Sequence, residues 1–180
     1  KKCKELLLKN GKIKILDLCT GSGAIAVSLS IFLGDEAEVF ASDISTKALE
    51  VAKYNNGKNN TNVRFIESNL FKNIQEQKFN IIVSNPPYIR SDVINKLSKQ
   101  VQNEPHLALD GGEDGLKFYK KIIEQSCNYI ENGYLILEIG YDQKEDVENL
   151  LKENKNYSEI KTIQDLSGND RCVIAKVGKI

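Results

Sequence analysis

The tetrapeptide Asn85-Pro86-Pro87-Tyr88 carries the clearest chemical signal in this sequence. Two consecutive prolines remove backbone donors and stiffen an extended segment, so carbonyl groups are left free to accept hydrogen bonds. The side-chain oxygen of Asn85 and the carbonyl of Pro86 can each accept one N–H of a planar NH2 group, and the ring of Tyr88 can pack over it. We therefore expect Asn85, Pro86 and Tyr88 to act in catalysis, and these three with Pro87 to bind the substrate.

An amide or arylamine nitrogen is a poor nucleophile, because its lone pair is delocalised. Such a site can accelerate the reaction mainly by holding the nitrogen in line with an electrophile. Hydrogen-bond acceptors also stabilise the positive charge that develops on the nitrogen. No histidine base is needed, so we expect His106, the single histidine, to be a surface or loop residue. The alternative is a purely structural role for this tetrapeptide, as a rigid turn with a capping asparagine, and its position directly after an apolar strand disfavours that role.

A glycine-bearing loop, Thr20-Gly21-Ser22-Gly23, gives a second signal, because it follows an apolar run and precedes a helical pattern. Such a loop lets the backbone pass close to a ligand. Asp43 follows Gly23 by twenty residues, at the expected end of the next strand, where its carboxylate can accept hydrogen bonds from both hydroxyls of a ribose. Loop and acid together predict a nucleoside cofactor. A nicotinamide dinucleotide is the rival, but its three-glycine pattern fits only if Ala26 replaces the third glycine.

The elements that must position these motifs alternate between strands and helices. Strands are predicted at 13–19, 38–44, 62–67, 79–84 and 133–139, helices at 24–33, 46–54, 115–130 and 142–153, and a final hairpin from 159–164 and 172–177. The helix at 24–33 is apolar on nearly every side, Ser45 can cap the next helix, and Ala48, Leu49, Val51 and Ala52 form its apolar face.

This order predicts an α/β fold: a mostly parallel seven-stranded sheet with helices on both faces and a C-terminal antiparallel hairpin. Ligands bind such sheets in a crevice at the carboxyl ends of the strands. The long connection from Arg90 to Asp114 starts at that edge, so we expect it to be functional.

Composition narrows the classes of partner. The 180 residues suit one domain, 1–180, and the 25 basic and 25 acidic residues cancel, which disfavours nucleic acid. No apolar run reaches the roughly 20 residues of a membrane span, and the four scattered cysteines match no metal motif, so we expect no membrane, no metal and a cytoplasmic location. The chain starts at Lys1 and has no methionine, so we expect it to be a fragment.

The motifs together resemble the Rossmann-like class I methyltransferases, and among them the protein-(glutamine) methyltransferases of the HemK/PrmC type. The resemblance covers nearly the whole chain and lies in 17–26, 41–45, 84–89 and 137–140, with a substrate-side segment marked by Glu104-Pro105, Gly111-Gly112 and Phe118-Tyr119. It implies S-adenosyl-L-methionine as cofactor and a peptide-chain release factor as protein substrate, methylated on the glutamine of a Gly-Gly-Gln tripeptide. By this resemblance we expect the family's N-terminal helical domain to lie outside residues 1–180.

By this resemblance the cofactor is bound by Cys19, Thr20, Gly21, Ser22, Gly23, Asp43, Asn69, Leu70 and Asn85, and Glu104 joins the substrate site. Two positions depart from the family: Cys19 stands where glycine is frequent, and Asn69 where an acid is usual. Two alternatives stay open. One is an enzyme that methylates the amino group of adenine in DNA or RNA, which shares Asn-Pro-Pro-Tyr, and the other is a non-catalytic domain that binds S-adenosylmethionine.

Overall fold

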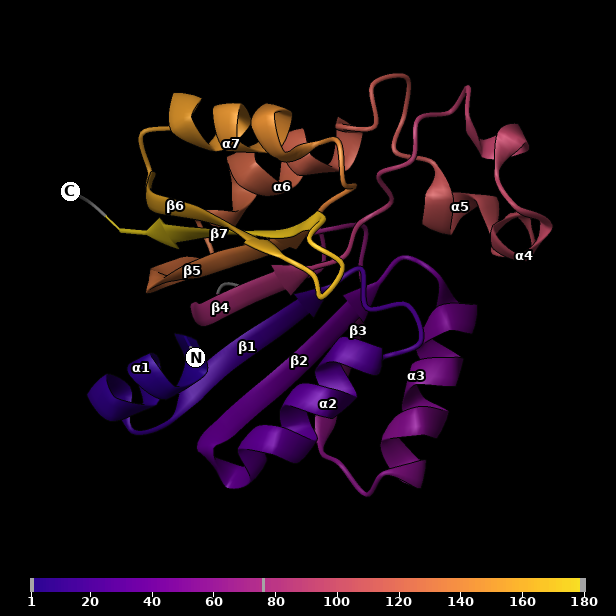
Figure 1. Ribbon diagram of the computed structural model, residues 1–180. Coiled ribbons are helices and arrows are strands. Elements are labelled where there is room, and N and C mark those ends of the chain that lie inside the picture. Colours follow the sequence, from indigo (N-terminus) through magenta and orange to yellow (C-terminus); the bar gives the residue numbers. More distant parts are fainter. Residues whose placement is uncertain (1, 76, 179–180) are drawn as a thin grey trace.

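A computed structural model describes residues 2–75 and 77–178. Its centre is one seven-stranded sheet in the order β3-β2-β1-β4-β5-β7-β6 (Figure 1). The strands are β1 Ile13–Leu18, β2 Ala37–Asp43, β3 Val63–Glu67, β4 Phe79–Ser84, β5 Ile130–Glu138, β6 Tyr157–Gln164 and β7 Asp170–Val177. β7 is antiparallel to both of its neighbours, and the other pairs are parallel. The strand order reverses between β1 and β4, which is where sheets of this kind bind ligands.

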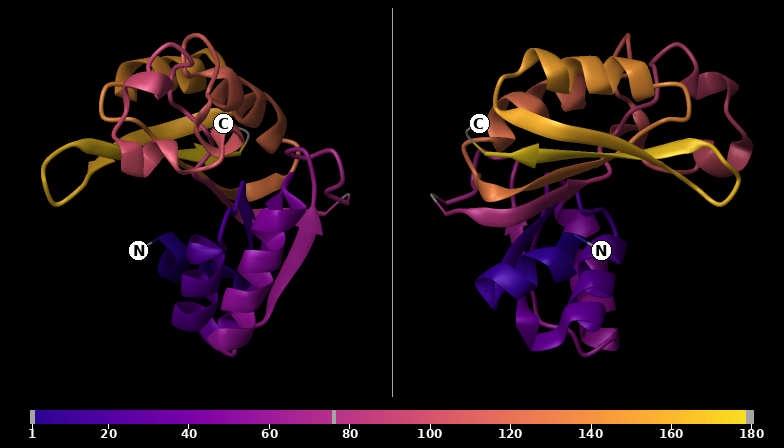
Figure 2. Two further views of the ribbon diagram at one scale, coloured as in Figure 1. Left: turned by 90° about the vertical axis from the view of Figure 1, so that its right-hand side faces the viewer. Right: turned by 60° about the vertical axis from the view of Figure 1, so that its left-hand side comes forward.

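Helices cover both faces of the sheet. α1 (Lys2–Asn10), α2 (Ala24–Leu33) and α3 (Thr46–Lys58) lie on one face, and α6 (Lys117–Ser126) and α7 (Lys144–Glu153) on the other (Figures 1 and 2). Side chains of β1 alternate between the two layers: Ile13 and Ile15 pack toward α1, whereas Leu16 and Leu18 join the larger core beneath α6 and α7. This period of two buries the central strand on both sides.

The predicted strands and the terminal hairpin are confirmed, and the turn of that hairpin projects beyond the rest of the sheet (Figure 2). β4 and α2 have the predicted bounds. Other ends move: β5 begins at Ile130 rather than 133, α3 continues to Lys58 rather than 54, and α6 covers 117–126 rather than 115–130.

Two predictions about apolar faces were wrong. The end of α2 was expected to pack on all sides, but Ile31 and Phe32 are exposed, Phe32 by 83%. Val51 was assigned to the apolar face of α3 and is also exposed. The sheet reaches each helix from one side only, so apolar residues on the far side find no partner among the described residues.

Four short helices and α1 were not predicted. η1 (Gly34–Glu36) joins α2 to β2, and η2 (Ile94–Lys96), α4 (Lys99–Gln102) and α5 (His106–Leu109) lie in the connection after β4. That connection is closed at its base, because Ile89 N donates to Leu109 O (2.9 Å) and Gly111 N to Ile89 O (2.8 Å). It is therefore a compact loop that lies beside the ends of the strands (Figure 1).

Candidate functional site

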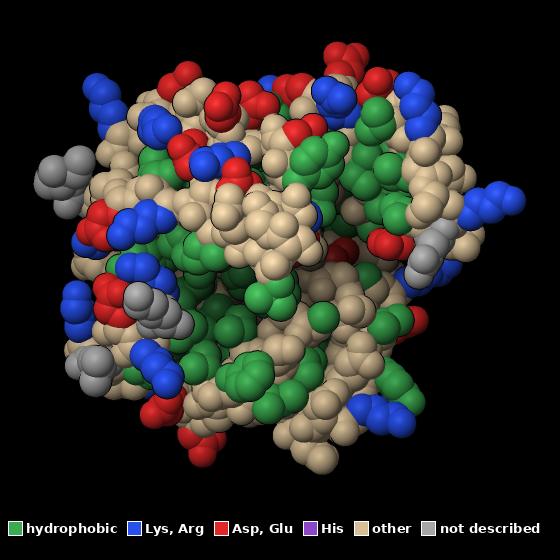
Figure 3. Space-filling view, in the orientation of Figure 1, with side chains coloured by type: hydrophobic (Ala, Val, Ile, Leu, Met, Phe, Trp, Pro, Cys, Tyr) green, Lys and Arg blue, Asp and Glu red, His purple; other side chains and the backbone are tan. Residues whose placement is uncertain are grey.

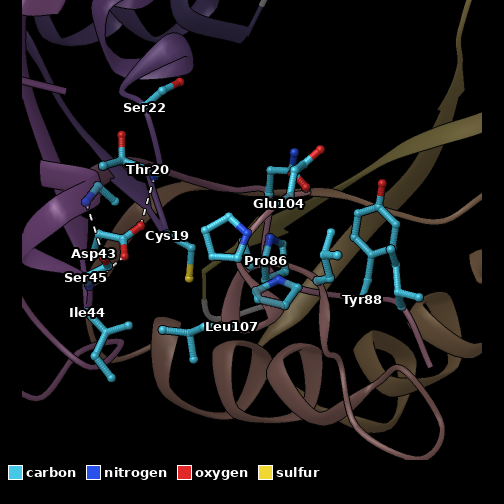
Figure 4. A pocket seen from close by; sticks show the side chains of 18 of the residues that line it. Cys19, Thr20, Ser22, Asp43, Ile44, Ser45, Pro86, Tyr88, Glu104 and Leu107 are labelled. Atoms are coloured by element: carbon cyan, nitrogen blue, oxygen red, sulfur yellow. Dashed lines mark hydrogen bonds between the residues drawn. The ribbon is translucent and has the colours of Figure 1, made fainter. Parts of the chain in front are cut away.

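The glycine loop, Asp43 and the Asn-Pro-Pro-Tyr segment line one pocket of about 660 Å³ at the carboxyl ends of β1, β2 and β4. The space-filling view shows the surface hollowed right of centre, with hydrophobic side chains around the opening (Figure 3). Cys19 and Asp43 lie on one side of the pocket and Tyr88 on the other, with Pro86 between them (Figure 4). Motifs that are 66 residues apart in sequence thus share one cavity.

Asp43 ties the glycine loop to the start of α3. One carboxylate oxygen accepts from Gly21 N (2.9 Å) and the other from Ser45 N (2.9 Å). Ser45 caps α3 as predicted, since its hydroxyl accepts from Ala48 N (3.2 Å). A carboxylate offers about four lone-pair sites, so Asp43 keeps two for a ligand after these two contacts. It serves the loop and remains able to bind hydroxyl groups.

Asp17 accepts hydrogen bonds from the start of the same loop and from the first turn of α2. It is fully buried, and one oxygen accepts from Thr20 Oγ1 (2.6 Å) and Ala26 N (3.0 Å), while the other has no partner among the described residues. Burial raises the pKa of Asp17 to about 7, against the opposing effect of these hydrogen bonds. The acid that shapes the loop therefore titrates near neutral pH.

Gly23 contributes by packing, since it does not line the pocket. It precedes α2 with φ of 82°, and a Cβ at this position would lie 2.9 Å from the Cβ of Ala52. Glycine therefore lets α2 and α3 approach each other closely. The cofactor contact expected of Gly23 stays a prediction.

A second pocket of about 210 Å³ adjoins the first and contains Asn69 and Leu70. Cys19, Asp43, Ile44 and Leu107 line both, so the two pockets form adjacent compartments. Cys19 and Leu70 have positive φ, 62° and 51°, a conformation that costs a non-glycine residue on the order of 1 kcal/mol. Burial raises the pKa of the Cys19 thiol to about 12, so this thiol is a neutral wall of the site.

The Asn-Pro-Pro-Tyr segment leaves β4 under restraint at both ends. The hydroxyl of Ser84 donates to Leu18 O (2.6 Å), and the carbonyl of Tyr88 accepts from Gln143 Nε2 (2.9 Å). Between these anchors, Asn85 is exposed at the pocket, and its side chain makes no hydrogen bond to the described residues. Its amide is therefore available to a ligand.

Tyr88 is half-buried. Burial raises the pKa of its hydroxyl, the charge of Glu138 raises it further, and Arg171 lowers it. Burial likewise raises the pKa of Glu138. The ring thus reaches from the pocket toward charged residues of β5 and β7.

Glu104, the expected substrate residue, lines the same pocket from the connection after β4, with Leu97, Val101 and Leu107. His106 is exposed and lies 3.9 Å from Asp110, in agreement with a surface role. In the part of the chain that the structure describes, no three histidine, cysteine or acidic side chains cluster as metal ligands do, and no helix has the length and apolarity of a membrane span.

Sequence reasoning assembled most of the pocket but missed part of it. Of the predicted site residues, all except Gly23 line one compartment or both. Further wall residues of the larger pocket, not named as site residues from the sequence, are Ala24, Ile25, Ile44, Ser45, Ala48, Ile89, Leu97, Val101, Pro105, Leu107, Ala108 and Leu109, of which Pro105, Ala108 and Leu109 belong to the substrate-side segment of the resemblance. Ala24 and Ile44 adjoin the motifs and could have been found from that position, whereas Leu97 and Val101 carry no local signal.

Comparison with known proteins gives matches along the chain. A family model described as "Methyltransferase small domain" matches residues 4–112. A release factor glutamine methyltransferase of Thermodesulfovibrio yellowstonii is 40% identical over 179 residues, which cover 98% of this chain and 63% of that protein. One from Clostridium acetobutylicum is 44% identical over 180 residues, 97% of this chain and 62% of that protein. The chain thus spans about three fifths of these relatives.

Solved structures agree on the fold. A methyltransferase from Pyrococcus furiosus superposes with a TM-score of 0.71 at 22% identity, over 98% of this chain and 82% of that one. The catalytic domain of hMettl16, solved with an RNA hairpin of the MAT2A 3'UTR, has a TM-score of 0.69 at 16% identity, over 98% and 67%. The predicted Rossmann-like sheet is confirmed. Sequence identities this low support the fold alone.

Proposed function

Because the chain belongs to the methyltransferase small domain family, we propose that it transfers a methyl group from S-adenosyl-L-methionine to the side-chain amide nitrogen of a glutamine in a peptide-chain release factor. One observation carries the proposal: the acceptor groups of Asn85 and Pro86 share a pocket with the glycine loop and Asp43. The names of the relatives at 40% and 44% identity support the substrate.

The residues present suit the cofactor. A nucleoside with a charged amino-acid tail needs an acceptor for its ribose hydroxyls and a loop that its tail can approach. Asp43 retains free lone pairs, and a Cβ built at Gly21 would meet no atom within 4 Å, so open space adjoins the loop. The compartment with Asn69 lies next to Asp43, where a base joined to that ribose would extend. Asn69 can accept from an amino group of the base.

When bound, S-adenosylmethionine supplies a methyl group carried on a positively charged sulfur, and S-adenosylhomocysteine and a proton are the other products. The chain itself binds and orients the amide. Asn85 Oδ1 and the Pro86 carbonyl accept its two N–H groups, so the nitrogen is held in one plane, and Tyr88 packs beside it. These acceptors also stabilise positive charge on the nitrogen until its proton leaves.

A release factor is the proposed partner, and the cytoplasm, where translation takes place, is the proposed location. Nucleic acid is the second candidate substrate, because Asn-Pro-Pro-Tyr also suits the amino group of adenine and one solved structure of this fold holds RNA. The balanced charge of the chain favours protein.

A transfer assay with methyl-labelled cofactor tests the proposal. The chain should label a release factor, and labelling should vanish when the glutamine of the factor's Gly-Gly-Gln is replaced by alanine. A ribosomal protein, duplex DNA and RNA hairpins serve as competing substrates. Labelling of adenine without labelling of the factor would reverse the order of the two candidates. Cofactor binding without transfer to any substrate would leave only a binding domain.

A further inference from the structure

Gln143 lies at a junction of three loops behind the Asn-Pro-Pro-Tyr segment. Its side chain is buried, with a residue exposure of 7%, at the N-terminal end of α7. Nε2 donates to Tyr88 O (2.9 Å) and, at longer range, to Gly115 O (3.4 Å). Oε1 accepts from Gly140 N (3.0 Å) and lies 3.4 Å from the Tyr119 hydroxyl, which donates at shorter range to Glu138 O (2.9 Å). One amide therefore links the ends of β4 and β5 to the start of α6.

Three glycines make room for this junction. A Cβ at Gly115 would lie 2.6 Å from Tyr88 O and 2.7 Å from Gln143 Nε2, and a Cβ at Gly140 would lie 2.9 Å from Gln143 Oε1. A Cβ at Gly111 would lie 2.7 Å from Tyr88 Cα. No side chain fits at these positions without displacing Tyr88 or Gln143, so the backbone of Tyr88 is enclosed on the side away from the pocket.

We infer that Gln143 is a positioning residue for methyl transfer, acting through Tyr88. This inference rests on the proposed function. The reactive segment has few internal hydrogen bonds of its own, since prolines occupy two of its four positions. Ser84, bonded to Leu18 O, holds one end of the segment. At the other end Gln143 holds the Tyr88 carbonyl itself, while the backbone bonds of Ile89 to Leu109 and Gly111 hold the chain one residue later. Loss of the second anchor lets Asn85 and Pro86 shift against the cofactor, and shifts of about 1 Å can cost about 100-fold in rate.

Gln143→Glu tests the hydrogen bond that Gln143 donates to Tyr88 O without changing the size of the side chain. The carboxylate keeps the size of glutamine and still accepts from Gly140, but it opposes the carbonyl oxygen of Tyr88. When protonated, the same group donates to that oxygen again. Burial and the facing carbonyls should raise the pKa of the introduced acid, so its protonation falls in a usable pH range.

Other titratable groups lie around the junction: Tyr88, Tyr119 of α6, Glu138 of β5, Arg171 of β7, and Asp142 and Lys144 beside Gln143 itself. The parent carries all of them. Titration that the parent shares therefore cancels in the ratio of variant to parent at each pH, and the ratio reports the introduced carboxyl together with its effect on these neighbours. Gln125→Glu, a partly exposed position on α6, is the matched control for the added charge.

The experiment measures kcat, the KM for S-adenosylmethionine and the thermal midpoint of the chain from pH 5.5 to 8.5. At pH 8.5 the kcat of Gln143→Glu should be about 10- to 100-fold below the parent, with the KM for cofactor within about threefold, and the kcat ratio should recover as pH falls. Gln125→Glu should follow the parent at every pH. An unchanged kcat ratio in folded Gln143→Glu overturns the inference, and so does a loss that appears equally in cofactor KM.

Amide exchange, which is measured without a methyl acceptor, tests the role of Gln143 independently of the proposed function. Amide exchange at Ile89 and Ser91, whose N–H groups donate to Leu109 O and Gly112 O, should rise at least about tenfold in Gln143→Ala, while exchange in α2 stays at the parental rate. If the parent methylates no release factor, the proposed function fails, and this exchange decides the inference. Parental exchange in Gln143→Ala then rejects it.

Discussion

Asp43→Ala should weaken the binding of S-adenosylmethionine by roughly 10- to 150-fold. The structure shows which contacts are lost. Asp43 accepts from Gly21 N and Ser45 N, each at 2.9 Å, and its remaining lone pairs face the pocket. Hydrogen bonds to a charged group contribute about 1.5–3 kcal/mol, and each 1.4 kcal/mol is tenfold in a dissociation constant, which gives the stated range for the ribose contacts. Loss of the two internal bonds should also lower the free energy of unfolding.

Calorimetry measures the affinity, and urea unfolding without cofactor measures the stability. Ser45→Ala is the matched control, because it removes the cap of α3 without touching the carboxylate. It should cost about 1 kcal/mol of stability and leave the affinity within about twofold. If Asp43→Ala loses stability but binds cofactor like the parent, Asp43 serves only the loop, and the assignment to ribose is refuted.

Three further predictions test other parts of the site. Asn85→Ala should lower kcat by about 100-fold or more with a much smaller change in cofactor affinity, whereas Asn85→Asp keeps the acceptor and should retain activity; parental turnover by the alanine variant would refute the mechanism. The pKa of Asp17, about 7, lies above its unfolded value, so its contribution to stability is present below about pH 4 and is lost as pH rises through 7. Asp17→Asn should therefore gain on the order of 4 kcal/mol relative to the parent between pH 4 and 8 in urea unfolding, and a pH-independent difference would contradict the burial argument. Gly111→Ala should lower the free energy of unfolding by about 1–3 kcal/mol, because its Cβ would meet the backbone of Tyr88. Gly57→Ala, whose Cβ would meet no atom within 4 Å, should raise it by about 0.5–1 kcal/mol in the same urea unfolding experiment.

Sequence patterns predicted elements best where local chemistry defines their ends. α2 starts after Gly23 and stops at Gly34, both with positive φ, and β4 ends next to two prolines. α1 escaped prediction because its sequence is rich in lysine. It is held by Leu6, which packs on residues of the adjacent strand β1 and on Ile81 and Tyr134, far along the chain. Contacts of this kind override local preference, and a period of only three apolar residues, Cys3, Leu6 and Leu7, is too short to predict a helix.

Site residues were likewise predictable where local sequence defines them and unpredictable where distant contacts do. Residues within motifs could be placed because parallel strands bring their carboxyl ends to one edge. Gln143 could not, since its role depends on the carbonyl of Tyr88, 55 residues away, and on two glycines that admit it. Asp17 was part of a recognised segment, but its raised pKa follows from complete burial, which only the packed structure shows.

The position of β7 has a consequence for how the chain is made. β7 follows β6 in sequence, yet it lies between β5 and β6, and both of them pair with it rather than with each other. During synthesis β6 leaves the ribosome with no place in the sheet, and the nine-residue strand β5 keeps an open, apolar edge until Asp170–Val177 follow. Assembly of this half of the sheet must therefore wait for Asp170–Val177. A chain released before Asp170 would carry two unpaired strands into solution, where they can pair with those of other chains.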